Sequence, residues 1–176
     1  TSLAQQLKQV AQIISLHADI GATRQIFFCS QGGYDNHSDL LPSHDSLLNV
    51  LGPAMTAFYR ATGELGVAES VTAFTASEFG RTMNASSTIG SDHAWGNHHF
   101  VLGGAVRGGE MYGRFPSLEL EGPDDAGDRG VWIPTTSLDQ YAASLASWFG
   151  VGAEGLAQVF PNLGNFGGLG VAGLMG

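Results

Sequence analysis

The chain has 176 residues, a formal net charge of −9 and only 7 lysine and arginine residues. Such a surface repels nucleic-acid phosphates and anionic lipids, so neither nucleic acid nor a membrane surface is an expected partner. Hydrophobic residues make up 43% of the chain, enough for one ordinary globular domain, and no apolar run reaches the length of a transmembrane helix. A small anionic ester is compatible with this charge if bound cations reverse it locally.

The first half of the chain predicts two helices around a short strand. Apolar residues at helical spacing favour a helix at 2–20 and a second at 45–65, which Gly52 and Pro53 should kink or split. The apolar run at 25–29 between these helices is typical of a buried strand.

The second half predicts shorter elements. They are strands at 70–75 and 99–103, a polar loop at 76–97, and helices at 137–149 and 153–160. The alternation of helix and strand favours an α/β fold in which helices flank a mainly parallel sheet, with functional loops at the C-terminal ends of the strands. We expect one such domain over residues 1–165 and a glycine-rich tail over residues 166–176.

Asp35 and His37 form the first candidate metal-binding pair. Residues two apart in an extended segment project to the same side, so both side chains could reach one cation. The alternative is a turn in which Asp35 accepts main-chain N–H groups and His37 is exposed.

The second candidate cluster combines one carboxylate with three imidazoles within eight residues. Its members are Asp92, His93, His98 and His99. Oxygen and imidazole ligands together suit Zn²⁺ or Mn²⁺, with Ca²⁺ as a further candidate cofactor. Adjacent side chains of an extended segment point to opposite sides, so we expect only one of the last two histidines to face the site. The alternative is a loop in which the histidines only cap and fill.

Glu78 and Arg81 follow the predicted strand at 70–75 and are the candidate catalytic residues. The carboxylate could assist proton transfer, and the arginine could hold an anionic group. An ordinary salt bridge or two exposed charges would explain both residues equally well. Acidic residues at 124–128 could bind Ca²⁺, although their spacing does not fit an EF-hand and favours a solvated loop.

Four stretches that contain or adjoin these residues resemble a bacterial secreted family known as domain of unknown function 1501. The stretches are Gly32–His37, Thr75–Thr82, Gly90–Gly104 and Trp132–Ser137. The resemblance runs in order along most of the chain. Members of the family are about twice as long or longer, so the resemblance implies that this chain is their C-terminal half.

The family is placed with the alkaline phosphatases and sulfatases, so the resemblance also implies part of a metal-dependent hydrolase domain of that fold. The implied ligands are Asp35 and His37 for one cation, Asp92 and His93 for another, and His98 or His99 to complete the first site. The nucleophile and one more metal-binding aspartate would come from the N-terminal half, which is therefore an expected partner. Exported precursors in the family imply a periplasmic or extracellular location.

The sequence thus leads to two functional hypotheses. The first is a metal-dependent domain that hydrolyses phosphate or sulfate esters and is incomplete without its N-terminal half. The second is a non-catalytic secreted module in which a metal stabilises a binding or assembly surface, for example in a homo-oligomer. The histidine and aspartate clusters favour the enzyme, whereas the missing nucleophile and the glycine-rich apolar tail favour the module.

Overall fold

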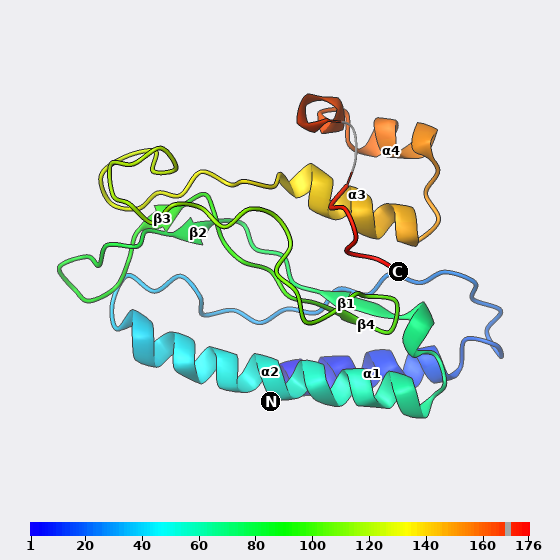
Figure 1. Cartoon of the computed structure of the whole chain (residues 1–176). Coiled ribbons are helices and arrows are strands. Elements are labelled where there is room, and N and C mark those ends of the chain that lie inside the picture. The colour runs from blue at the N-terminus through cyan, green and yellow to red at the C-terminus, as the bar shows by residue number, and fades with distance from the viewer. Residues whose placement is uncertain (168–169) are drawn as a thin grey trace.

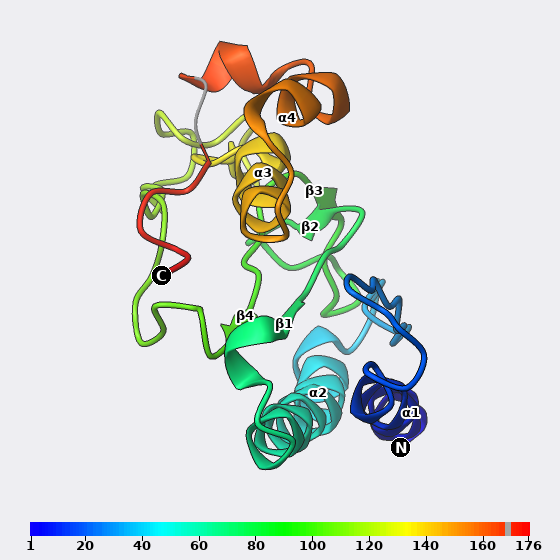
Figure 2. The same ribbon diagram turned by 90° about the vertical axis from the view of Figure 1, so that its right-hand side faces the viewer.

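The computed structural model describes residues 1–167 and 170–176, with helices on both sides of a thin central layer (Figures 1 and 2). Helices α1 (Ser2–Ser15) and α2 (Leu40–Glu64) pack side by side on one side of this layer, and α3 (Leu138–Trp148) and α4 (Ala153–Val159) lie on the other. The other elements among the described residues are the 3₁₀ helices η1 (Ala68–Ser70) and η2 (Leu163–Phe166) and the strands β1 (Thr72–Phe74), β2 (Gly80–Arg81), β3 (His93–Ala94) and β4 (Val101–Gly103).

The strands are antiparallel, so the predicted mainly parallel α/β sheet of the alkaline phosphatase and sulfatase type is wrong for this chain. β1 pairs with β4 and β2 pairs with β3, in two separate two-stranded sheets. Strands do form within the predicted ranges 70–75 and 99–103, but the fully described chain between them holds the β2–β3 pair and no helix. Parallel neighbours need a long crossover connection, usually a helix, and without one this chain returns antiparallel.

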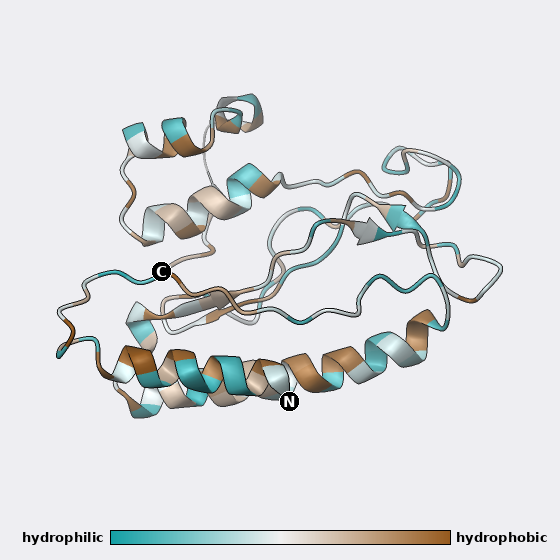
Figure 3. Ribbon diagram, turned by 180° about the vertical axis from the view of Figure 1, so that it is seen from behind, coloured by the Kyte–Doolittle hydropathy of each residue, from teal (hydrophilic) through white to brown (hydrophobic). Residues whose placement is uncertain are grey.

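The predicted strand at 25–29 is extended but pairs with no strand among the described residues. Phe27 and Cys29 pack against the core cluster, whereas Ile26 and Phe28 are 82% and 92% exposed. Figure 3 shows this apolar stretch as a coil that runs alongside the central layer, facing α1 and α2. Its side chains therefore alternate as in a strand, while its main chain lacks a strand partner.

The core lies between α1, α2 and the central layer. Val10 and Ile14 of α1 meet Phe58 of α2, and Val71 and Ala73 around the start of β1 pack on the same cluster. The apolar periodicity that predicts the first two helices thus corresponds to the faces that they bury.

The helix boundaries differ modestly from the predicted ones. α1 ends at Ser15 instead of residue 20, and α2 begins at Leu40 instead of residue 45. α2 continues through Pro53 as one helix, so the predicted split does not occur. The predicted capping box of Ser137 and Gln140 is confirmed at the start of α3.

The described part of the C-terminal tail packs on the body of the protein. The Val171 N–H donates to Ser144 Oγ (2.6 Å), the Arg107 N–H donates to the Leu174 carbonyl (3.1 Å), and Leu174 is buried. Residues 168–169 of the predicted tail lie outside the described residues. No helix in the described ranges has both the length and the apolar character needed to cross a membrane.

Candidate metal centre

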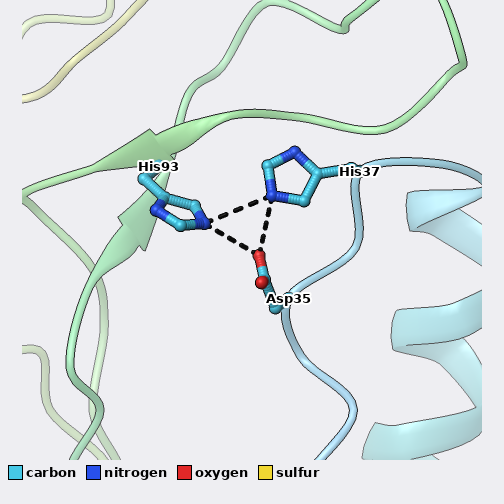
Figure 4. Close-up of side chains that lie close together, drawn as sticks. All are labelled: Asp35, His37 and His93. Carbon is cyan, nitrogen blue, oxygen red and sulfur yellow. Dashed lines mark hydrogen bonds and ion pairs between the residues drawn. The ribbon is translucent and has the colours of Figure 1, made fainter.

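Asp35, His37 and His93 bring one carboxylate and two imidazoles together where the loop before α2 meets β3 (Figure 4). The two Nε2 atoms lie 3.2 Å apart, and Asp35 Oδ1 lies 3.0 Å from that of His37 and 2.9 Å from that of His93. Each of the three side chains is slightly more than half exposed. Of the two predicted pairs, Asp35 and His37 both belong to the cluster, whereas the second pair contributes His93 and not Asp92.

Main-chain hydrogen bonds join the two loops that carry these side chains. The Ser91 N–H donates to the Asn36 carbonyl (3.1 Å), and the Leu40 N–H donates to the Ile89 carbonyl (3.1 Å). These bonds flank His37 on both sides and end two residues before His93. The positions of the ligands are therefore set by the backbone of both loops.

Glycine is needed where the loops touch. A Cβ atom at Gly90 would overlap the main-chain carbonyl group of His37, and one at Gly80 in β2 would overlap the carbonyl group of Gly96. Both contacts are with backbone, which cannot swing aside as a side chain can. Glycine at positions 80 and 90 therefore allows the two pairs of backbone segments to approach this closely.

Arg81 anchors Asp35 from the inner side of the cluster. Its guanidinium, 12% exposed, donates through Nη1 to Asp35 Oδ1 (2.5 Å), through Nε to Ser91 Oγ (2.9 Å) and through Nη2 to the Asn36 carbonyl (2.7 Å). The hydrogen bond from Arg81, followed by that from His93, holds the pKa of Asp35 below its usual range. Most of the donors of Arg81 are thus engaged inside the protein, and its predicted contact with an anionic group stays a prediction.

Asp92 lies beside the cluster and faces the outer nitrogen of His37. Its Oδ1 atom is 3.6 Å from His37 Nδ1, and its Oδ2 atom accepts a hydrogen bond from Arg129 Nη1. The Arg129 guanidinium lowers the pKa of Asp92. Asp92 therefore contacts His37 from behind and is not one of the three side chains that converge.

The structure does not bring His98 and His99 to this cluster. The His98 ring stacks on Phe115, with centroids 5.4 Å apart, and the His99 ring stacks on Tyr141 at 5.5 Å. His99 Nδ1 also lies 3.4 Å from Thr75 Oγ1, and burial lowers the pKa of this imidazole. Aromatic stacking thus accounts for the orientation of both histidines.

Glu78, the second candidate catalytic residue, lies apart from the cluster, and two hydroxyl groups close to it in sequence are hydrogen-bonded to main chain. Glu78 is exposed and forms no hydrogen bond or ion pair with any described residue. Ser77 Oγ donates to the Phe79 carbonyl (3.1 Å), and Thr82 Oγ1 donates to the Asn84 carbonyl (3.1 Å). Neither hydroxyl thus donates to a side-chain base that would activate it as a nucleophile.

Two residues of the centre are missed by sequence reasoning. The Phe79 ring stacks on the His93 imidazole at 4.0 Å, and Arg129 reaches Asp92 from 37 residues away. No local spacing connects Phe79 to His93. Arg129 did offer a signal, because it is one of only 7 lysine and arginine residues and directly follows the acidic residues at 124–128.

That acidic loop uses its carboxylates internally. Asp124 accepts two hydrogen bonds from the Arg114 guanidinium (2.9 and 2.8 Å), which together with the Ser117 N–H lower its pKa to about 2. Asp125 accepts main-chain N–H groups from Glu121, Gly127, Gly130 and Val131. The loop is thus held together by these two side chains and is more than a solvated acidic surface.

Residues 4–126 match the model of a family described as "Protein of unknown function (DUF1501)". The matched range is more than two thirds of the chain and includes Asp35, His37, Arg81 and the Asp92–His93 pair. No curated protein and no solved structure matches the chain. The chain therefore belongs to the DUF1501 family of proteins of unknown function.

Proposed function

We propose that Asp35, His37 and His93 bind one divalent metal ion, with zinc or manganese preferred over calcium. The observation that carries this proposal is that their three ligand atoms lie within 4.8 Å of one another. Ligands at the usual zinc distances are about 3.4 Å apart in a tetrahedral site. The separations of 2.9 to 3.2 Å need to open by only a few tenths of an ångström to admit an ion.

The exposure of the ligands favours a catalytic site over a structural one. Structural zinc ions have four protein ligands, whereas catalytic ions keep three and leave a position for water or substrate. Here three ligands converge, and slightly more than half of each side chain is open to solvent. An ion at this position would polarise an ester oxygen or lower the pKa of a bound water.

The charge around the centre favours an anionic ester as the substrate. The carboxylates of Asp35 and Asp92 are balanced by the guanidinium groups of Arg81 and Arg129, so a divalent ion would make this patch positive. We therefore infer hydrolysis of phosphate or sulfate esters, in a periplasmic or extracellular setting. The N-terminal half of a longer precursor would supply the nucleophile, because the Ser77 and Thr82 hydroxyls donate to main-chain carbonyls and not to a side-chain base.

One observation favours the alternative, a metal-stabilised assembly module. Ile26 and Phe28 are the two most exposed large apolar side chains of the described residues, and they lie on an extended segment without a strand partner. A partner polypeptide would bury such side chains. In this second proposal the metal fixes the loop that follows this segment and performs no reaction.

Zinc titration of the purified chain tests the metal site. We expect one ion per chain by calorimetry, lost in His93→Ala and retained in the matched control His17→Ala, whose ring lies at the end of α1. Equal binding by wild type and His93→Ala would rule the site out.

Hydrolysis of aryl phosphate and aryl sulfate esters, assayed with added Zn²⁺, Mn²⁺ or Ca²⁺, separates the two functions. We expect the chain alone to turn over slowly, because covalent catalysis needs a positioned nucleophile. Fast, metal-dependent turnover that His93→Ala abolishes would instead show that the reactive groups are all within this chain. Metal binding with no turnover, even after the N-terminal half is added, would favour the assembly module.

A further inference from the structure

A line of contacts connects the acidic loop at residues 121–132 to the candidate metal centre. Four main-chain N–H groups of this loop converge on the carboxylate of Asp125, which fixes the shape of the loop around Arg129. The Arg129 carbonyl accepts the Asn84 N–H (3.0 Å), so the loop is also tied to the segment after β2. The hydrogen bonds of this loop thus hold the backbone of Arg129 in place beside the candidate metal centre.

The Arg129 guanidinium is aimed at Asp92. Nη1 donates to Asp92 Oδ2, while Nη2 lies 3.4 Å from the Asn84 carbonyl and 3.5 Å from the Ala85 carbonyl. The bond to Asp92 is the short one, and the two longer contacts with main-chain carbonyls orient the other side of the guanidinium.

Asp92 itself is held by its main chain. Its N–H donates to Thr82 Oγ1 (3.1 Å), and its carbonyl accepts the Thr82 N–H (2.9 Å). With Oδ2 held by Arg129, the free Oδ1 atom faces His37 Nδ1 at 3.6 Å. The opposite ring nitrogen, Nε2, faces Asp35 and His93.

We propose that Arg129 is a positioning residue that acts through Asp92 on His37. Held in this way, Asp92 keeps the proton of His37 on Nδ1 and the lone pair of Nε2 directed at the metal. The proposal rests on the metal site proposed above. A carboxylate behind a histidine ligand fixes the tautomer and the orientation of the ring. The 3.6 Å separation becomes a hydrogen bond when the atoms approach by about 0.5 Å, a shift within reach of a small ring rotation.

The opposite hypothesis is that Asp92 is itself a ligand and that Arg129 competes with the metal for it. The two hypotheses predict opposite effects of removing the guanidinium. If Arg129 positions Asp92, its loss weakens metal binding, whereas if it competes, its loss strengthens metal binding.

The test compares Arg129→Met and Arg129→Lys with Arg60→Met, a control that removes the same charge from an exposed site on α2. Competition with a coloured chelator gives the zinc affinity. We expect Arg129→Met to bind about tenfold more weakly, Arg129→Lys to recover part of the loss, and Arg60→Met to bind as wild type. Unchanged or tighter binding by Arg129→Met would overturn the proposal.

A second readout does not depend on metal. Nitrogen-15 spectra of the imidazole rings in the metal-free protein report which nitrogen of His37 carries the proton. In the metal-free protein Asp35 faces Nε2 of His37 at 3.0 Å and competes with Asp92 for the proton. We therefore expect a larger share of Nδ1–H in wild type and Arg129→Lys than in Arg129→Met; identical spectra for all three would overturn the proposal. If wild type binds no zinc, the proposed metal function fails, yet these spectra still decide whether Arg129 positions His37.

Discussion

The Nε2 atoms of His37 and His93 lie 3.2 Å apart, although 56 residues separate them in the chain. Both also face one oxygen of Asp35 at about hydrogen-bond distance. Two imidazole lone pairs repel at this separation, so at least one proton must lie between these three atoms in the metal-free protein. A metal ion would take the place of that proton.

Zinc binding is expected to release a proton from any imidazole that is charged, whereas a neutral imidazole only moves its proton to the other ring nitrogen, so the number released should grow as the pH falls. Calorimetric titrations near neutral pH, in buffers that differ in ionisation enthalpy, give the number released. Acidification should weaken binding, because the imidazoles must be deprotonated at Nε2, while Asp35, with its lowered pKa, stays ionised in mild acid. Zinc affinity that does not change between neutral and mildly acidic pH would contradict a histidine-based site.

Asp35→Asn is expected to reduce zinc affinity by more than about tenfold. The substitution removes the only carboxylate of the proposed ligand set and leaves the positive charge of Arg81, close to the ion, without its ion-pair partner. Glu78→Gln and His98→Ala serve as controls, since neither side chain reaches the cluster. A loss of affinity in His98→Ala as large as that in Asp35→Asn would show that the ring leaves Phe115 to bind the metal.

Gly90→Ala should destabilise the protein by about 1–3 kcal/mol, because its Cβ would overlap the His37 carbonyl group. Gly52→Ala is the matched control: no atom lies near its added Cβ within α2, so it should stabilise by about 0.5–1 kcal/mol. Urea unfolding of both variants measures the two free energies. If Gly90→Ala is as stable as wild type, the two loops do not touch as described.

The Asp124–Arg114 pair predicts a specific loss of stability in acid. The pKa of Asp124 is about 2 in the folded protein, against 3.8 for an unperturbed aspartate, so its contribution is full above about pH 4. That contribution is lost as the pH falls towards 2. Asp124→Asn should be less stable than wild type at neutral pH and should lose less stability between pH 4 and 2.

Thermal unfolding over this pH range measures the effect, with Asp19→Asn as a control that removes one exposed negative charge. Parallel pH profiles for wild type and Asp124→Asn would mean that the ion pair contributes nothing to folding.

Local features of the fold could be predicted from the sequence, but the pairing of the strands could not. The periodic apolar residues of α1 and the capping box at Ser137 depend on neighbours within one or two turns. Strand direction depends on distant partners instead. β1 and β4 are three residues each, and such short runs carry no signal of whether they lie parallel or antiparallel.

The sequence predicts the pairs Asp35–His37 and Asp92–His93 as metal ligands at the ends of parallel strands. The structure brings Asp35, His37 and His93 together for a different physical reason and leaves Asp92 beside them. Main-chain bonds between the two loops bring them together, and the ends of parallel strands do not. The sequence alone could not show that the His98 ring stacks on Phe115, which keeps it away from the candidate metal centre. Contacts between segments far apart in the chain decide both outcomes.

The backbone links on either side of His37 have a consequence for how this centre could change over evolutionary time. Because the Asn36–Ser91 and Leu40–Ile89 bonds involve only main-chain atoms, the scaffold does not depend on which side chains stand at positions 37 and 93. Exchange of either histidine for aspartate or cysteine would alter the preference for a metal while the loops keep their places. The metal-binding side chains can thus change during evolution while the fold that positions them stays the same.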